Sequence, residues 1–90
     1  MKSELTEDFL ALFRKLSPRI QRTARKNYQL WKKNPHHPSL EFKKLQAVND
    51  LHSVRIGIGW HAIGTVKDKK TIVWFWVGSH SDYNQLLEKL

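Results

Sequence analysis

The chain has 90 residues, no cysteine, and 16 Lys and Arg against 8 Asp and Glu, which gives a formal net charge of +8. A chain of this length is predicted to fold as one domain, residues 1–90, and leaves no room for an enclosed cofactor cavity. The lack of cysteine excludes disulfides, thiolate metal sites and cysteine nucleophiles, and is typical of a reducing compartment. The longest apolar run, residues 72–77, is too short to cross a membrane, and residues 1–8 do not resemble a secretion signal. We therefore expect a soluble, cytoplasmic protein with no membrane partner.

Two helices are predicted in the first third of the chain. Residues 6–16 repeat apolar side chains at helical spacing. Ser17 followed by Pro18 has the pattern of an N-cap and a first helical residue, and this second helix is expected to end near Lys33, because Asn34 precedes a proline. The residues predicted to line its buried face are Ile20, Ala24, Tyr28 and Trp31. The two helices are expected to form a hairpin.

The outer surface of this hairpin is strongly basic. Residues 14–33 contain eight basic side chains and no acidic one. Such a block attracts a phosphate backbone through counterion release, and it also suits an acidic protein partner. A solvated charged helix face is the alternative interpretation. The candidate RNA-binding residues on the second helix are Arg19, Arg22, Lys26 and Lys33.

The pattern changes to strands after Pro38. Residues 40–45 are predicted to form a short strand, residues 52–66 one long strand, and residues 71–77 a central strand that is apolar on both faces. The turn between the last two is predicted at residues 68–70. The three glycines within residues 52–66 indicate a bulge or a close backbone approach.

A closing helix is predicted over residues 81–90, where Tyr83, Leu86, Leu87 and Leu90 form an apolar stripe. The predicted fold class is therefore α+β, with an N-terminal helical hairpin packed on a small, twisted, antiparallel sheet and a short C-terminal helix.

No metal, phosphate-loop or hydrolase motif stands out, so the candidate site rests on Arg and His side chains. His80 follows the central strand at a helix start, where an exposed imidazole can exchange protons near neutral pH. Arg55 and His61 have the same parity, but six residues of strand would separate them by about 20 Å unless the glycines bend the chain. Tyr83 could stack on a base or donate a proton, although it also completes the helix stripe. Trp74 and Trp76 are either a stacking platform or core.

Five stretches, in this order and spacing, resemble one known family. They are residues 18–21 (PRIQ), 34–40 (NPHHPSL), 53–56 (SVRI), 60–62 (WHA) and 72–80 (IVWFWVGSH). Together they resemble the RelE/ParE toxin superfamily, in its plasmid-stabilisation or translational-repressor branch. The resemblance implies the fold outlined above and a small, acidic antitoxin as partner.

The resemblance also implies an activity. RelE, YoeB and YafQ relatives cut mRNA on the ribosome without a metal or other cofactor, by attack of a 2′-hydroxyl on the next phosphate. Carried over by position, Arg55 binds the phosphate and His80 is the general acid. Tyr83, as a possible proton donor, is a further catalytic candidate. His61 occupies the place of an arginine in many relatives. The further residues implied to bind RNA are His37, Lys43 and Lys44.

The sequence departs from this pattern at three points. Gly59 stands where nuclease relatives often have an acid, and His61 replaces the arginine. Glu41 is the one carboxylate near the expected site. Two alternatives therefore stay open: a ParE-type inhibitor of DNA gyrase, and a catalytically weak or non-toxic member that binds an antitoxin.

Overall fold

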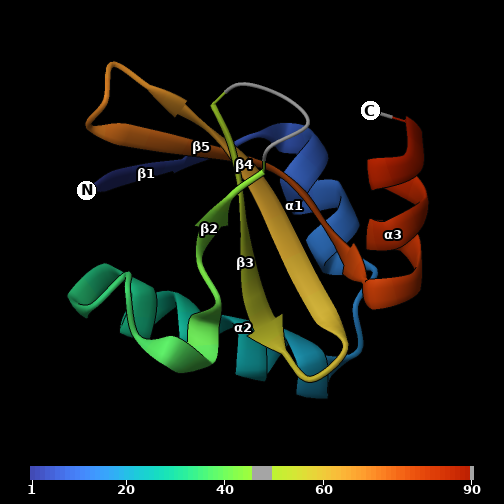
Figure 1. Ribbon diagram of the computed structural model, residues 1–90. Helices are drawn as coiled ribbons and strands as arrows, with labels where there is room; N and C mark the ends of the chain where they lie inside the picture. The colour runs from blue at the N-terminus through green and yellow to red at the C-terminus, as the bar shows by residue number, and fades with distance from the viewer. Residues whose placement is uncertain (46–49, 90) are drawn as a thin grey trace.

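A five-stranded sheet carries two helices on one face and a third helix on the other (Figure 1). The computed structural model describes residues 1–45 and 50–89. The elements in chain order are β1 (Lys2–Leu5), α1 (Glu7–Arg14), α2 (Pro18–Lys33), the 3-10 turn η1 (Pro38–Leu40), β2 (Lys43–Lys44), β3 (Leu51–Gly57), β4 (Trp60–Lys67), β5 (Thr71–Ser79) and α3 (His80–Lys89). The strands lie in the order β1-β5-β4-β3-β2, so the α+β class is confirmed.

The predicted helical hairpin is present, and local capping sets its ends. Thr6 accepts a hydrogen bond from the backbone N–H of Phe9 at the start of α1, and Ser17 accepts one from Ile20 at the start of α2. The side-chain amide of Gln21 donates to the carbonyls of Phe13 and Leu16, so α2 caps the end of α1. α1 packs on β5 and α2 packs on β3.

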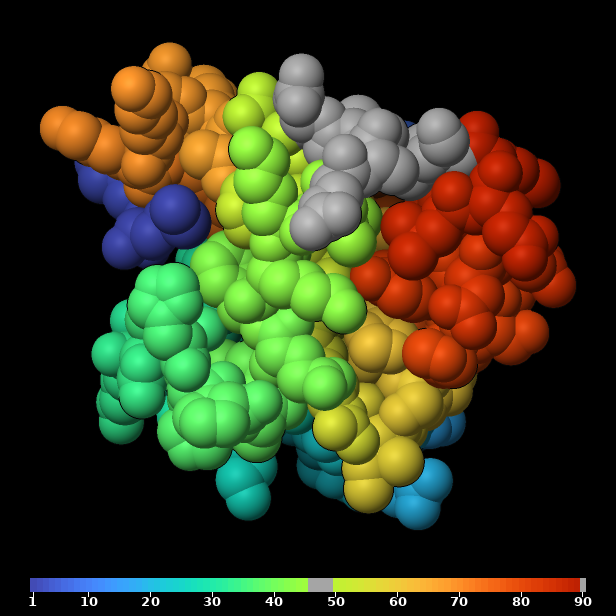
Figure 2. All heavy atoms as spheres, in the orientation of Figure 1, coloured from blue at the N-terminus to red at the C-terminus, as the bar shows by residue number. Residues whose placement is uncertain are grey.

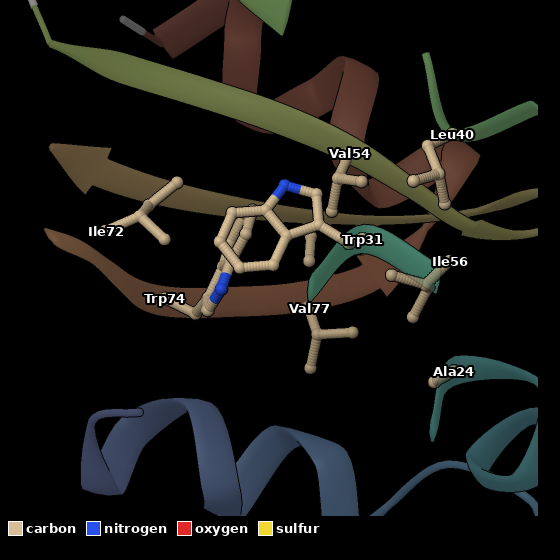
Figure 3. Close-up of a cluster of buried hydrophobic side chains, with 9 residues drawn as sticks. Ala24, Trp31, Leu40, Val54, Ile56, Ile72, Trp74 and Val77 are labelled. Atoms are coloured by element: carbon tan, nitrogen blue, oxygen red, sulfur yellow. The ribbon is translucent and has the colours of Figure 1, made fainter. Parts of the chain in front are cut away.

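The main core lies between these two helices and the sheet. Trp31, 1% exposed, meets Trp74 and Phe42 edge to face, with ring centroids 5.5 and 5.7 Å apart. Figure 3 shows its indole among aliphatic side chains from β3 and β5. Ile20 and Ala24 are buried as predicted, and Tyr28 is half-buried with its hydroxyl bonded to that of Ser3.

The predicted long strand is wrong, because it is two strands. Residues 52–66 contain the β3–β4 hairpin, which turns at Ile58 and Gly59, and Gly59 has a φ of 77° that favours glycine. The 40–45 strand is shorter than expected: only Lys43–Lys44 pair with β3, since η1 precedes them and Glu41 takes a left-handed conformation with φ 46°.

The sheet is mixed and not antiparallel throughout. β1, which the sequence analysis did not predict, pairs in parallel with β5. The turn after β4 is confirmed: Asp68 and Lys69 have φ of 55° and 61°, which is typical of a tight hairpin turn.

A smaller core lies under α3 on the second face. Its buried residues are Leu45, Leu51, Ile63 and Tyr83. The helix begins at His80, one residue earlier than predicted, and Leu86 and Leu87 are half-buried, while Leu90 lies outside the described residues. Within residues 1–45 and 50–89, no helix is long and apolar enough to span a membrane.

Candidate functional site

The β3–β4 hairpin and the start of α3 bring the candidate polar residues together. Arg55 lies directly opposite His61 in the pairing of β3 with β4. The backbone N–H of His80 donates to the carbonyl of Gly59 over 2.7 Å, which fixes the first residue of α3 against the hairpin turn. In Figure 2 the red atoms of α3 abut the yellow atoms of β4. The chain reversal between Arg55 and His61, which one small site needs, is therefore present.

Two imidazoles face each other at the centre of the site. His61 Nε2 and His80 Nδ1 are 2.9 Å apart, a hydrogen-bond distance. The ring of Tyr83 stacks on His61, with centroids 4.4 Å apart and planes within 19°. Tyr83 is 6% exposed, so its ring is part of the α3 core and supports His61 from within. His80 is the exposed member of the pair, and His61 is half-buried.

A cation and a carboxylate border the imidazole pair. The guanidinium of Arg55 lies 3.8 Å from the carboxylate of Glu41, and both are partly open to solvent, so this pair adds little to stability. Lys43 pairs with Ser53, two residues before Arg55, and so projects from the same face of the sheet.

The surroundings of His61 favour its neutral form. Burial lowers the pKa of His61 below its usual value of 6.5, and the neighbouring His80 lowers it further. Arg55 and Lys43 act in the same direction, and Glu41 opposes them. The pair therefore favours one added proton over two, since two imidazolium ions at contact would repel each other.

Other predicted residues lie away from this cluster. The helix α2, with Arg19, Arg22, Lys26 and Lys33 exposed along it, packs on the opposite face of the sheet from His61. Lys44 pairs with His52 and so projects from that opposite face too. His37 caps η1, where its Nδ1 lies 3.2 Å from the backbone nitrogen of Ser39 and 2.8 Å from its hydroxyl.

The two tryptophans of β5 have different places. Trp74 is 3% exposed and belongs to the main core, so the stacking-platform interpretation is wrong for it. Trp76 is half-buried beside Tyr83, with ring centroids 6.4 Å apart. Its indole covers Gly78, where an added Cβ would lie 2.7 Å from the ring.

Two features of the site were not predicted from the sequence. The Gly59 carbonyl anchors His80, and the Gly57-Ile58-Gly59 stretch that makes this turn was available as a hairpin signal between alternating segments. Glu41, the carboxylate expected near the site, lies beside Arg55 with a left-handed backbone that the sequence did not signal.

A cavity of about 370 Å³ lies on the other face, between α1, α2 and the sheet. The residues that line it include Phe9, Phe13, Tyr28 and Trp31, with the cations Arg14, Arg25 and Arg55. Among the residues that the structure covers, no cluster of three His, Cys, Asp or Glu could hold a metal ion.

The sequence of this chain matches the model of a known family. The family model of the ParE-like toxin domain matches residues 18–85. The chain belongs to the RelE/ParE toxin superfamily. No curated protein matches the sequence.

Solved structures of toxins share the fold of this RelE/ParE member. The isolated RelE toxin of E. coli is 18% identical with a TM-score of 0.66, covering 98% of this chain and 96% of that one. YafQ of E. coli is 15% identical with a TM-score of 0.70, covering 91% and 96%. The RelE–RelB complex of Pyrococcus horikoshii is 17% identical with a TM-score of 0.68, covering 88% and 93%. At these identities the likeness shows the fold alone. Several neighbours were solved as complexes of RelE with RelB, and two of these are described as toxin–antitoxin complexes.

Proposed function

We propose that this chain is the single-domain toxin, residues 1–90, of a type II toxin–antitoxin system and a ribosome-dependent mRNA endonuclease that needs no metal. The observation that carries the proposal is the contact of His61 with His80 beside Arg55, on the α3 face of the sheet. Cleavage in the cytoplasm would repress translation.

The proposed chemistry assigns one side chain to each of the two proton transfers and one to the negative charge of the phosphorane. The 2′-hydroxyl loses its proton and attacks the adjacent phosphorus, the P–O5′ bond breaks, and the products are a 2′,3′-cyclic phosphate and a 5′-hydroxyl. Glu41 accepts the first proton, since its carboxylate is exposed and lies 3.8 Å from Arg55. Arg55 stabilises the pentacoordinate phosphorane. His80 donates a proton to O5′, as its exposure permits.

The remaining candidates support this reaction from a distance. Tyr83 is buried, so it holds His61 and does not stack on a base. Lys43 projects on the side of Arg55 and adds a phosphate contact. Lys44, on the opposite face of the sheet, and His37, at the start of η1, are assigned to RNA binding outside the imidazole pair. The cations assigned to rRNA, by counterion release, are Arg19, Arg22, Lys26 and Lys33.

The antitoxin partner is proposed to occupy the helical face. Named relatives form complexes with RelB antitoxins. The cavity between α1 and α2 is lined mostly by apolar and aromatic side chains and includes three arginines, which suits an acidic segment with apolar side chains.

The test is primer extension on mRNA bound to translating ribosomes, with purified wild type and His80→Ala. We expect new 5′ ends within A-site codons, and a loss of about 10²–10⁴-fold in the variant, which is the usual contribution of a general acid. His52→Ala is the matched control, because this histidine projects from the other face of the sheet and stacks on Phe42.

Each alternative function predicts a different result with the same purified proteins. Absence of cleavage by folded wild type, together with inhibition of DNA gyrase supercoiling that His80→Ala retains, identifies a gyrase inhibitor. Absence of both activities, with antitoxin binding intact, identifies a non-toxic member. Each result contradicts the nuclease proposal.

A further inference from the structure

We propose that His61 is a positioning residue, which accepts a hydrogen bond from His80 and so keeps Nδ1 of His80 protonated and Nε2 turned outward as the reactive nitrogen. This role deepens the proposed nuclease function, and its catalytic consequence rests on that function. The placement of the proton, by contrast, is a property of the folded chain and is measurable without a substrate.

The hydrogen bond between the two rings allows two arrangements. His61 Nε2 and His80 Nδ1 are 2.9 Å apart, so one nitrogen carries the hydrogen and the other supplies a lone pair. If His61 donates, the remaining proton of neutral His80 is on Nε2. If His61 accepts, the proton of His80 is on Nδ1 and its Nε2 is a free base. The two arrangements give His80 opposite chemistry on its outer nitrogen.

The surroundings of the two rings favour His61 as the acceptor. His61 is half-buried and stacked on the buried ring of Tyr83, whereas His80 is exposed at the first residue of α3. Arg55 from β3 and Lys43 from β2 add positive charge on the side of His61, and Glu41 is the carboxylate that opposes them. An added proton is therefore disfavoured on His61, and the proposal places it on His80. His80 then carries hydrogens on both nitrogens, and Nδ1–H can bond only to the lone pair of His61 Nε2.

The same hydrogen bond persists when His80 gives up its proton. Nε2–H transfers to O5′ while the electron pair of the P–O5′ bond moves to that oxygen, and His80 remains as the neutral Nδ1–H tautomer. Water then returns a proton to Nε2. A neutral imidazole orients His80 as a carboxylate orients the histidine of a catalytic triad, but it adds no negative charge that would raise the basicity of His80.

The test compares two substitutions of His61 by NMR of the full-length protein labelled with 15N at histidine. His61→Gln keeps an uncharged oxygen acceptor near the position of Nε2. His61→Leu removes the acceptor but keeps an apolar contact with Tyr83. Long-range 1H–15N spectra distinguish a protonated ring nitrogen from a bare one. The histidine His52, on the other face of the sheet, is the internal reference.

The expected spectra follow from the hydrogen bond. Neutral His80 has a protonated Nδ1 and a bare Nε2 in wild type and in His61→Gln, and shifts to the Nε2–H tautomer in His61→Leu, while His52 is the same in all three. Neutral His80 with a bare Nδ1 in the wild type overturns the proposal. So does a His80 tautomer that His61→Leu leaves unchanged in a protein with native backbone spectra.

Cleavage rates give the second, kinetic readout. His61→Leu is expected to lower the cleavage rate on the order of 10²-fold, which is less than the roughly 10⁴-fold loss caused by a wrong tautomer in a serine protease. His61→Gln is expected to lower the cleavage rate by less than about tenfold. Equal losses in the two variants overturn the positioning role. If no variant and no wild type cleaves mRNA, the nuclease proposal fails while the spectra still decide the tautomer of His80.

Discussion

The two faces of the sheet differ in how completely their side chains are buried and in whether polar side chains lie beside the core. On the α1–α2 face, Trp31, Trp74, Leu40 and Ile72 are at most 3% exposed. On the α3 face, the core is smaller, and the half-buried His61 lies directly beside it. The sheet therefore separates the residues that contribute most to stability from the candidate catalytic residues. A well-packed face tolerates few polar groups, whereas a face with a smaller core can hold an imidazole that is partly buried and still accessible to solvent.

The largest expected effect is on the well-packed face. Trp31→Ala removes a ring that is 1% exposed, and we expect the free energy of unfolding to fall by about 3–5 kcal/mol, measured by urea denaturation. Trp31→Phe keeps much of the ring and removes an indole N–H that has no partner among the described residues, so it should cost clearly less. Leu87→Ala, on half-buried α3, should also cost less. A Leu87→Ala cost equal to that of Trp31→Ala would break the comparison of the two faces.

A matched pair of glycines sharpens the same comparison. An added Cβ at Gly64 would lie 2.8 Å from the buried Trp74 ring and 3.0 Å from the carbonyl oxygen of Val73. At Gly78 it would meet only the half-buried Trp76 ring, which can move toward solvent. We expect Gly64→Ala to cost about 1–3 kcal/mol of stability. Gly78→Ala should cost less than about 1 kcal/mol and should change the fluorescence of Trp76. The reverse order of stabilities would contradict the assignment of the tighter packing to the α1–α2 face.

A smaller effect is expected from pH, and it arises at His61 on the α3 face. Because burial and His80 lower the pKa of His61 in the folded protein, the unfolded chain binds more protons as pH falls below the usual value of 6.5. The stability that His61 contributes is complete above that pH and is lost as pH falls toward its folded pKa. Chemical unfolding at pH 7.5 and pH 5 should show a smaller pH dependence in His61→Gln than in wild type. The variant His52→Gln should behave as wild type. Equal pH dependence in all three proteins would rule out a perturbed His61.

The smallest effect on stability is expected on the outer surface of α2. Arg22→Gln with Lys26→Gln should change the free energy of unfolding by no more than about 0.5 kcal/mol, since both side chains are exposed. Affinity for ribosomal RNA should fall, and the slope of log K against log salt should decrease by about 1.4, at roughly 0.7 for each phosphate that the protein no longer neutralises. Lys69→Gln with Lys70→Gln, at the β4–β5 turn, is the control of equal charge. An equal decrease in slope for both pairs would show that α2 holds no special RNA contact.

Much of the fold could be predicted from the sequence, because its elements are encoded locally. The Ser17-Pro18 cap, the stripe through Trp31 and the turn at Asp68 each depend on neighbours a few residues away. The errors fell where local signals compete. Residues 52–66 alternate as one strand would, and this alternation masked the hairpin signal of Gly57-Ile58-Gly59, where the structure places the turn. β1 is short, and its parallel pairing with β5 depends on a partner about 70 residues away.

The sequence by itself determined the order of helices and strands, the basic surface of α2 and the residue types available for chemistry. The tertiary structure alone decided which of these meet. It joined His61 to His80 through particular ring nitrogens, turned Glu41 toward Arg55, and put α2 on the face away from the imidazoles. The physical reason is that caps, turns and periodicity act over a few residues, whereas strand pairing and side-chain contacts are set by the free energy of the whole folded chain.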